Sequence, residues 1–260
     1  MEKILYAELT PQEFRNRLKA RPVAYLSVGT LEWHGEHLPF GTDALIGHGM
    51  LSEIARKAGG IVLPMMFMGP DGPVGEADGV PLYGMDGWTG EQEWGKKLRE
   101  PGRFEGSAYW QPEEHYMLQI NDILAQLARA GFKALVVDGH GPSVANIIRH
   151  NDELEKKYGL KIFNCWGYSE NGKWISINKE IAEATGITGG HGGSGETAGV
   201  MAFHPELVKL DQIPKGEWPH GVGGTQHPDF ATPEKGRVMA EMLSDFVAGQ
   251  INRHFASQPA

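Results

Sequence analysis

Apolar residues occur along the chain in short continuous runs, separated by longer stretches with helical spacing. Four runs have the length and apolar character of buried strands, at residues 23–28, 61–66, 134–137 and 161–165. Pro64 cannot donate to a strand ladder, so it suggests a sheet edge or a bend in the second run. Strands that alternate with helices indicate an α/β fold, a three-layer α/β/α sandwich around a mainly parallel sheet.

Apolar residues spaced three and four apart predict helices between these strands. The first helix opens at residues 10–13, which have the order of a capping box with proline in the first turn, and runs to about Lys19. Thr42 can cap a second helix, which the glycines at residues 59–60 end. Further helices are expected at residues 112–130, 143–158 and 176–184, with a short apolar helix after Thr197 and a last helix from Thr232.

Residues 67–110 show no convincing period of either kind. Glycine, proline, aspartate and aromatic residues dominate this stretch. A long irregular segment in a compact domain is usually functional or involved in assembly, and its aromatic content is too high for a disordered linker. We therefore expect an ordered, aromatic-rich arm inserted at about residues 67–112, acting as a lid or a subunit contact. The alternative is a disordered insertion.

Composition narrows the class of protein. The length of 260 residues suits one domain, which we expect to span residues 1–260. The formal net charge is −9 and the basic residues are dispersed, so neither nucleic acid nor a membrane surface is expected as a partner. The N-terminus lacks a signal-peptide core and no run approaches a membrane span, so we expect a cytoplasmic protein. The single Cys165 excludes an internal disulfide and is expected to be a small buried residue.

The densest chemistry lies at residues 32–43, just after the first predicted strand. Two histidines and three carboxylates occur within these twelve residues, interleaved with apolar side chains. In an extended chain Glu32 and His34 project to the same side, and a turn-forming proline and glycine could return Asp43 to the same space. Carboxylate with neutral imidazole suits Zn, Mn or Fe rather than Ca or Mg. A lone histidine or glutamate is more often a solvated surface residue, but the combination favours a metal site.

Two later segments carry residues of the same types. His140 lies between two glycines after the third predicted strand, and His191 and Glu196 flank a glycine run. Open α/β sheets bind their ligands at the carboxyl ends of the strands, so the three segments should converge. Alone, His140 or Glu196 would be structural about as often as functional. Together with the first segment they complete five candidate ligands for two divalent metal ions: Glu32, His34, Asp43, His140 and Glu196.

Two such ions would favour hydrolysis. Ions about 3.5 to 4 Å apart can activate a shared water as a bridging hydroxide and polarise a carbonyl at the same time. Asp43 is the candidate bridging carboxylate, and Glu196 is also a candidate catalytic residue. His191 is a candidate proton shuttle to the leaving group, since imidazole titrates in the required pH range. The alternative for His191 is a helix-capping or substrate-orienting histidine.

The three segments together resemble the creatininase (creatinine amidohydrolase) family. The resemblance is carried by residues 29–43, 138–141 and 191–197, in that order, and extends over roughly residues 23–201. It implies an α/β/α fold, two divalent metal ions per subunit and hydrolysis of a cyclic amide or related small molecule, often by a homohexamer. It also implies that Glu32, His34, Asp43 and His140 are metal ligands.

The chain departs from the family pattern at several positions. Trp33 stands where the family usually has glutamine, and Glu36 stands where it has proline. Creatininase itself has a glutamate ligand two residues after the second-motif histidine, where this chain has Pro142, so Glu196 is expected to ligate the second metal. The long aromatic insertion replaces a short connection. These departures leave the identity of the substrate open.

Several functions remain as alternatives at this stage. The leading hypothesis is a metal-dependent hydrolase of a small cyclic amide. The alternatives are a hydrolase that cleaves a carbon–carbon bond of an inositol-derived cyclic ketone, a metal-dependent sugar or polyol isomerase, and a non-catalytic assembly protein. Closed structural metal sites favour cysteine ligands, which argues against the last of these. The candidate substrate contacts are Trp33, His37, Trp166 and Trp174.

Overall fold

A computed structural model describes residues 3–87, 104–213, 215 and 217–257. Its central sheet has four strands in the order β2-β1-β5-β6, and each neighbouring pair is parallel. These strands are β1 (Val23–Val28), β2 (Ile61–Val62), β5 (Ala134–Gly139) and β6 (Lys161–Asn164). In the pairing of β1 with β5, Val28 lies opposite Gly139, so the carboxyl ends of the two central strands are level.

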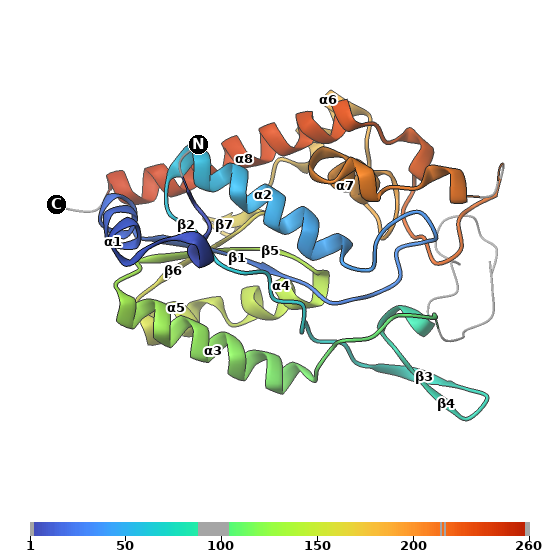
Figure 1. The fold of residues 1–260 in the computed structure, drawn as a ribbon, viewed down its shortest axis with the longest axis horizontal. Helices are drawn as coiled ribbons and strands as arrows, with labels where there is room; N and C mark the ends of the chain where they lie inside the picture. Colours follow the sequence, from blue (N-terminus) through green and yellow to red (C-terminus); the bar gives the residue numbers. More distant parts are fainter. Residues whose placement is uncertain (1–2, 88–103, 214, 216, 258–260) are drawn as a thin grey trace.

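Helices cover both faces of the sheet (Figure 1). One face is packed by α2 (Thr42–Ala58), α7 (Ser194–Phe203) and α8 (Pro233–Ala256), with α6 (Asn178–Thr185) against α8. The other face is packed by α3 (Glu113–Ala130), α4 (Gly141–Arg149) and α5 (Asn151–Tyr158). This arrangement confirms the expected α/β/α sandwich. None of the helices in the described part of the chain is long and apolar enough to cross a bilayer.

The core follows from strands that are buried on both sides. All six residues of β1 are buried, and successive side chains enter opposite layers. Val23 and Tyr25 pack towards α2 and α8, whereas Ala24 and Leu26 pack towards α3. Continuous apolar runs of this kind are typical of parallel strands covered by helices on both faces.

The ends of several helices match the sequence signals. Helix α1 (Pro11–Ala20) has the predicted capping box, in which the Glu13 carboxylate accepts from the Thr10 N–H at 2.7 Å. Thr42, expected to be a cap, is instead the first residue of α2, and its hydroxyl donates to the Pro39 carbonyl at 2.7 Å.

Two predicted elements are divided or shortened. The helix expected at residues 143–158 is two helices, α4 and α5, because His150 has φ −102° and ψ 11°, outside the helical range. The strand expected at residues 61–66 has regular pairing only in β2. Pro64 interrupts it, although the Met66 N–H still donates to the Ser27 carbonyl at 2.9 Å.

Both edges of the sheet are partly covered. At the β2 edge, the Val62 N–H donates to the Ile4 carbonyl at 2.9 Å and Leu5 forms a parallel bridge with Val62. At the β6 edge, the Ile162 N–H donates to the Glu155 carboxylate at 2.9 Å. The outer backbone groups of the two edge strands are therefore paired at these positions within the chain.

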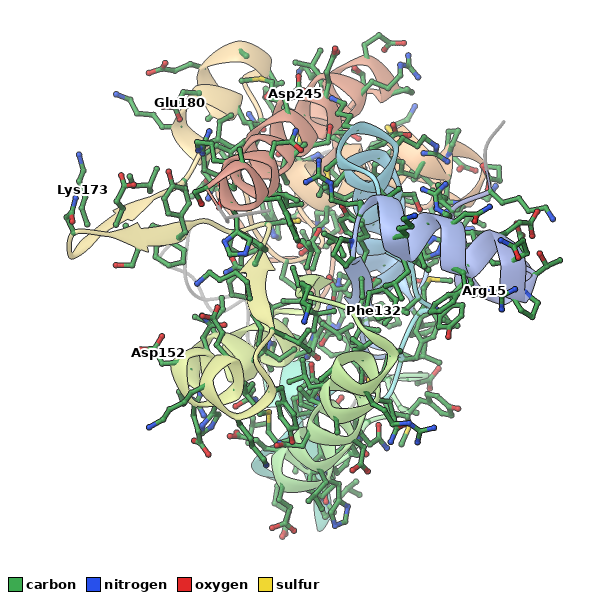
Figure 2. All side chains as sticks on the ribbon, turned by 90° about the vertical axis from the view of Figure 1, so that its left-hand side faces the viewer. Arg15, Phe132, Asp152, Lys173, Glu180 and Asp245 are labelled. Carbon is green, nitrogen blue, oxygen red and sulfur yellow. The ribbon has the colours of Figure 1, made fainter. Side chains whose placement is uncertain are left out.

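Two hairpins project from the sandwich. The irregular segment contains an antiparallel pair, β3 (Pro73–Ala77) and β4 (Val80–Tyr83), at the end of the molecule opposite to both termini (Figure 1). This hairpin was not predicted from the sequence pattern, and the part of the expected arm at residues 88–103 lies outside the described residues. A second hairpin, β7 (Tyr168–Glu170) with β8 (Lys173–Ile175), extends outward beyond β6, with Lys173 near its tip (Figure 2). Five short 3-10 helices complete the described elements: η1 (Tyr6–Glu8), η2 (Gly84–Gly87), η3 (Pro205–Leu207), η4 (Leu210–Gln212) and η5 (Pro228–Phe230).

Candidate metal centre

Six of the predicted side chains converge at the carboxyl ends of β1 and β5. They are Glu32, His34, Asp43, His140, His191 and Glu196. The first two come from the loop after β1, the third from the first turn of α2, and the fourth from the junction of β5 and α4. The last two come from the turn before α7 and from its first turn. Three segments far apart in sequence thus meet at one place.

His34 is held with one ring nitrogen facing the carboxylates. Its Nδ1 lies 3.0 Å from the Glu32 carbonyl, which can only accept, so Nδ1 carries the proton. Nε2 is buried without a hydrogen-bond partner, 3.4 Å from an Asp43 oxygen and 3.6 Å from a Glu196 oxygen. A bare lone pair at this distance from carboxylates is repelled, so the arrangement favours a proton or a metal ion on Nε2.

Asp43 directs its two oxygens to two different histidines. Oδ1 lies 3.4 Å from His34 Nε2, and Oδ2 lies 3.2 Å from His140 Nδ1. The same nitrogen of His140 is 3.1 Å from Glu32 Oε1. Candidate ligand atoms form three groups. Asp43 belongs to two of them, one with Glu32 and His140 and one with His34 and Glu196. The third group consists of Glu32, His34 and His191.

His191 stands beside this cluster in a defined orientation. Its Nε2 lies 2.5 Å from the Trp33 carbonyl and therefore donates, which leaves Nδ1 with a free lone pair. Nδ1 faces Glu32 at 3.9 Å, and the ring stacks on His34 with centroids 4.2 Å apart. The backbone thus aims the basic nitrogen of His191 at the cluster.

Glu196 is oriented by the turn that precedes it. Its Oε2 accepts from the Gly192 N–H at 2.6 Å, while the same oxygen faces His34. Burial raises the pKa of Glu196 to about 7, because the charged form has lost much of its solvation.

The electrostatics of the cluster favour added positive charge. Burial alone would lower the pKa of His34, but the carboxylates of Asp43 and Glu196 outweigh it and raise that pKa to about 10. His140 follows the same pattern: burial opposes protonation, but Asp43 and Glu32 raise its pKa to about 10. His191 differs, because burial and the neighbouring His34 lower its pKa to about 4. His191 is thus a neutral imidazole at neutral pH.

The donor set fits divalent transition metals. Three carboxylates and two buried imidazoles, each with a ring nitrogen facing them, match the ligand chemistry of Zn, Mn or Fe. The fixed Nδ1–H of His34 is the arrangement usual for a histidine that binds metal through its other nitrogen.

Two other predicted residues lie beside the cluster with structural contacts of their own. Trp33 stacks on Phe104 with centroids 5.1 Å apart, and its indole N–H donates to the His220 carbonyl at 2.9 Å. His37 is buried, and its Nε2 lies 3.0 Å from the Thr197 hydroxyl, so it packs the loop against α7. Neither belongs to any of the three ligand groups.

The remaining predicted aromatic residues are placed elsewhere. Trp166 is partly buried against the apolar layer that includes α3. Trp174 lies on β8, is 50% exposed, and lines a cavity of about 680 Å³ between the β7–β8 hairpin and α8. None of the six residues of the cluster lines that cavity. Within one chain, the structure does not bring these two tryptophans to the candidate metal centre.

The structure adds one acidic residue that motif reasoning missed. Asp71 lines a cavity that Glu32 also borders. In the sequence it stands in a Gly-Pro-Asp-Gly-Pro stretch, and those residue types are adequately explained by a turn. Only the fold shows that this turn lies beside the cluster.

Comparison with known proteins agrees with the geometry. The family model described as "Creatininase: Creatinine amidohydrolase" matches residues 7–81 and 89–251. Creatinine amidohydrolase of Pseudomonas putida is 24% identical over 284 residues, covering 98% of this chain and 98% of that protein. A crystal structure of creatinine amidohydrolase has a TM-score of 0.72 at 21% identity, covering 99% of this chain and 100% of the other. A structure described as "Creatininase Mn" has a TM-score of 0.71 at 22% identity, covering 97% and 99%.

The family model and the relatives show that this chain is an enzyme, a hydrolase of small molecules, and the buried cluster supplies candidate metal ligands. The chain belongs to the creatininase (creatinine amidohydrolase) family. The resemblance seen in the three sequence segments is confirmed.

Proposed function

We propose that this chain is a dinuclear metal-dependent hydrolase of a small cyclic substrate, with cyclic amides as the leading class. The observation that carries the proposal is the position of Asp43, whose two oxygens face His34 on one side and His140 on the other. A carboxylate shared in this way suits two ions. Glu32, Asp43 and His140 would hold one ion, and His34, Asp43 and Glu196 the other.

Charge balance supports two ions rather than one. Glu32, Asp43 and Glu196 together carry up to three negative charges in a largely buried space, and imidazoles that bind metal through a lone pair are neutral and contribute none. One divalent cation would leave part of this charge uncompensated, which is costly in a low-dielectric environment. Among the similar structures, one is described as a Zn-Zn form and one as a Mn form of creatininase. We therefore expect Zn, Mn or Fe.

The chain's own residues would move the proton. When bound, a pair of divalent ions lowers the pKa of water and polarises a carbonyl. His191 is neutral, and its Nδ1 lone pair points towards the cluster, so it can accept a proton from the attacking water. The water oxygen bonds to the carbonyl carbon, the ring C–N bond breaks, and His191 returns the proton to the leaving nitrogen. The Trp33 carbonyl keeps the ring orientation fixed throughout.

A second reaction is compatible with the same residues. Hydrolysis of a carbon–carbon bond in an inositol-derived cyclic ketone also requires water to attack a ring carbonyl. It is favoured by the described cavity beside Glu32, which has carboxylates and aromatic rings but no lysine or arginine in its lining. A sugar or polyol isomerase is the third possibility.

The first experiment is elemental analysis of the purified protein, followed by a screen of cyclic amides, formamides and inositol-derived ketones. We expect two equivalents of transition metal per chain and turnover of at least one ring class. Reaction in ¹⁸O-labelled water should place the label in the product of a hydrolase, whereas an isomerase product would remain unlabelled. A metal-free active enzyme would contradict the proposal.

The assembly and location of the protein stay predictions. The family resemblance predicts a homo-oligomer, specifically a homohexamer, and the sequence signals alone predict a cytoplasmic location. Light scattering of the purified protein measures the oligomeric state. A monomer at micromolar concentration would contradict it.

A further inference from the structure

A second cavity opens onto the candidate metal centre from the side of the β3–β4 hairpin. Its volume is about 320 Å³, and Glu32 belongs both to its wall and to the cluster. A ring whose carbonyl reacts at the cluster would extend into this space. The cavity therefore faces the part of the substrate that does not react.

One wall of this cavity is aromatic. Tyr83, from β4, and Trp110, from the segment before α3, have ring centroids 4.4 Å apart at an angle of 35°. Both are half-buried. Aromatic faces of this kind provide flat apolar contact for the face of a small ring.

The charged groups in the described lining are all acidic: Glu32, Asp71 and Asp86. Asp86 is already used by the fold, since it accepts from the Tyr83 N–H at 3.2 Å and from the Phe104 N–H at 2.7 Å. Asp71 is different. Its Oδ1 accepts from the Gly72 N–H at 2.9 Å, whereas no hydrogen bond to Oδ2 is found among the residues that the structure describes.

The backbone holds the Asp71 carboxylate in place. Gly84, with φ +51°, lies directly against it, and any Cβ at this position would overlap the carboxylate oxygens. The Asp71 N–H donates to the Gln111 carbonyl at 3.3 Å, and the Gly84 N–H donates to the Gly72 carbonyl at 3.0 Å. Asp71 is thus a positioned acceptor rather than a free surface side chain.

The charge of the Asp71 carboxylate is only partly compensated. Burial raises the pKa of its carboxyl to about 6; Glu32 and Asp86 add to this effect, and the Gly72 N–H and His140 oppose it without cancelling it. No cationic side chain is found in the described cavity lining. A ligand that donates a hydrogen bond to Oδ2 of Asp71 would supply the donor that the described cavity lining lacks.

We propose that Asp71 determines substrate specificity by accepting a hydrogen bond from an N–H or O–H group on the substrate ring, opposite the reacting carbonyl. The face of the ring packs against Tyr83 and Trp110. The substrate class is accordingly a small neutral or cationic ring that carries donor groups, and rings bearing carboxylate or phosphate are repelled. This inference rests on the proposed function, because it assumes that the carbonyl reacts at the cluster.

Pairs of ring compounds that differ in their hydrogen-bond donors separate the contribution of the donor to binding from that of the ring. Creatinine carries an exocyclic amino group where 1,3-dimethylhydantoin has a carbonyl and no N–H, and scyllo-inosose carries hydroxyls that cyclohexanone lacks. Binding of each probe to the metal-loaded protein is measured by calorimetry, with no need for turnover. We expect the wild type to bind the donor-bearing member more tightly in at least one pair.

Asp71→Asn is the test variant. The amide oxygen can still accept from Gly72, but an NH₂ group replaces the acceptor in the cavity. The donor-bearing ring should bind about 10- to 100-fold more weakly, and its donor-free partner should change by less than about threefold. Glu76→Gln removes an exposed carboxylate of β3 outside the cavity lining and should change neither.

Several results would overturn this role for Asp71. They are a wild type that favours no donor-bearing ring, an Asp71→Asn variant that weakens both members of a pair equally, or a Glu76→Gln variant with the same effect. Metal content and thermal unfolding of each variant confirm that the site is intact. If Asp71→Asn does not fold, Asp71→Ala removes the acceptor without adding a donor, and the same loss of preference is expected. Failure of the proposed function would appear instead as absent metal or absent hydrolysis in the wild type, independently of Asp71.

Discussion

The loop that follows the central strand β1 and the segment that follows the edge strand β6 both carry tryptophan and glutamate, but they lie in different places. Segments after β1 and β5 meet the first turn of α7 and form the candidate metal cluster, whereas the aromatic segment after β6 turns outward as the β7–β8 hairpin (Figure 2). Both contain side chains suited to binding. The position of a strand in the sheet, more than the residue types that follow it, decides which loop reaches the site.

The strongest test of this comparison is Asp43→Ala, because Asp43 belongs to two of the three candidate ligand groups. We expect loss of both ions by elemental analysis and a fall in activity larger than the roughly 10- to 100-fold cost of disturbing an outer-shell partner. The matched control is Glu170→Ala on the outer hairpin, an exposed carboxylate whose removal should alter neither. Full metal occupancy in Asp43→Ala would rule out the bridging role.

His191→Gln should separate chemistry from metal binding. Glutamine can still donate to the Trp33 carbonyl but cannot carry a proton, so turnover should fall by roughly 10² to 10⁴-fold with metal content unchanged. Steady-state kinetics and metal analysis on the same preparation measure the two effects. Unchanged turnover would remove His191 as the proton carrier.

Gly47→Ala tests how closely α2 must approach the central strands. A Cβ at Gly47 would lie 2.8 Å from Ser27 Oγ and 3.1 Å from the Asp138 carbonyl, so the helix that carries Asp43 must shift. We expect a loss of about 1 to 3 kcal/mol in unfolding free energy by urea titration, with weaker metal binding. Gly249→Ala in α8, where the nearest atom to a new Cβ is Arg253 Nη1 at 3.4 Å, should instead stabilise by about 0.5 to 1 kcal/mol. Equal behaviour of the two variants would refute the close-packing argument.

Trp174→Ala should have the smallest effect. Its ring is half exposed and lines a cavity away from the cluster, so activity should change by no more than roughly twofold. A large loss of activity would mean that the hairpin contributes to the site of a neighbouring copy. Kinetics at several protein concentrations distinguish that case.

The sequence was most informative where local signals and burial agree. Apolar runs predicted the two strands that lie beside the site, β1 and β5. Residue types and spacing predicted the capping box at Thr10 and the set of candidate ligands. Their convergence followed from one rule about parallel sheets. The break between α4 and α5 at His150 could not be predicted, because the helical spacing of apolar residues continues across it.

Other features depend on contacts that sequence alone does not show. The β3–β4 hairpin lacks alternating apolar residues because most of its described side chains face solvent. Asp71 resembles an ordinary turn residue until the fold places it beside Glu32. Trp166 and Trp174 were predicted to contact substrate from their residue type alone. They follow the edge strand β6, and within one chain they lie away from the cluster.

The covered edges of the central sheet restrict how copies of this chain can associate. Backbone groups of Val62 are occupied by the N-terminal segment, and that of Ile162 is occupied by Glu155. An exposed strand edge is a template for joining sheets from separate molecules, and such capping discourages it. Any quaternary contact is therefore expected to form through side chains of helices and hairpins rather than through a ladder continued from one subunit into the next.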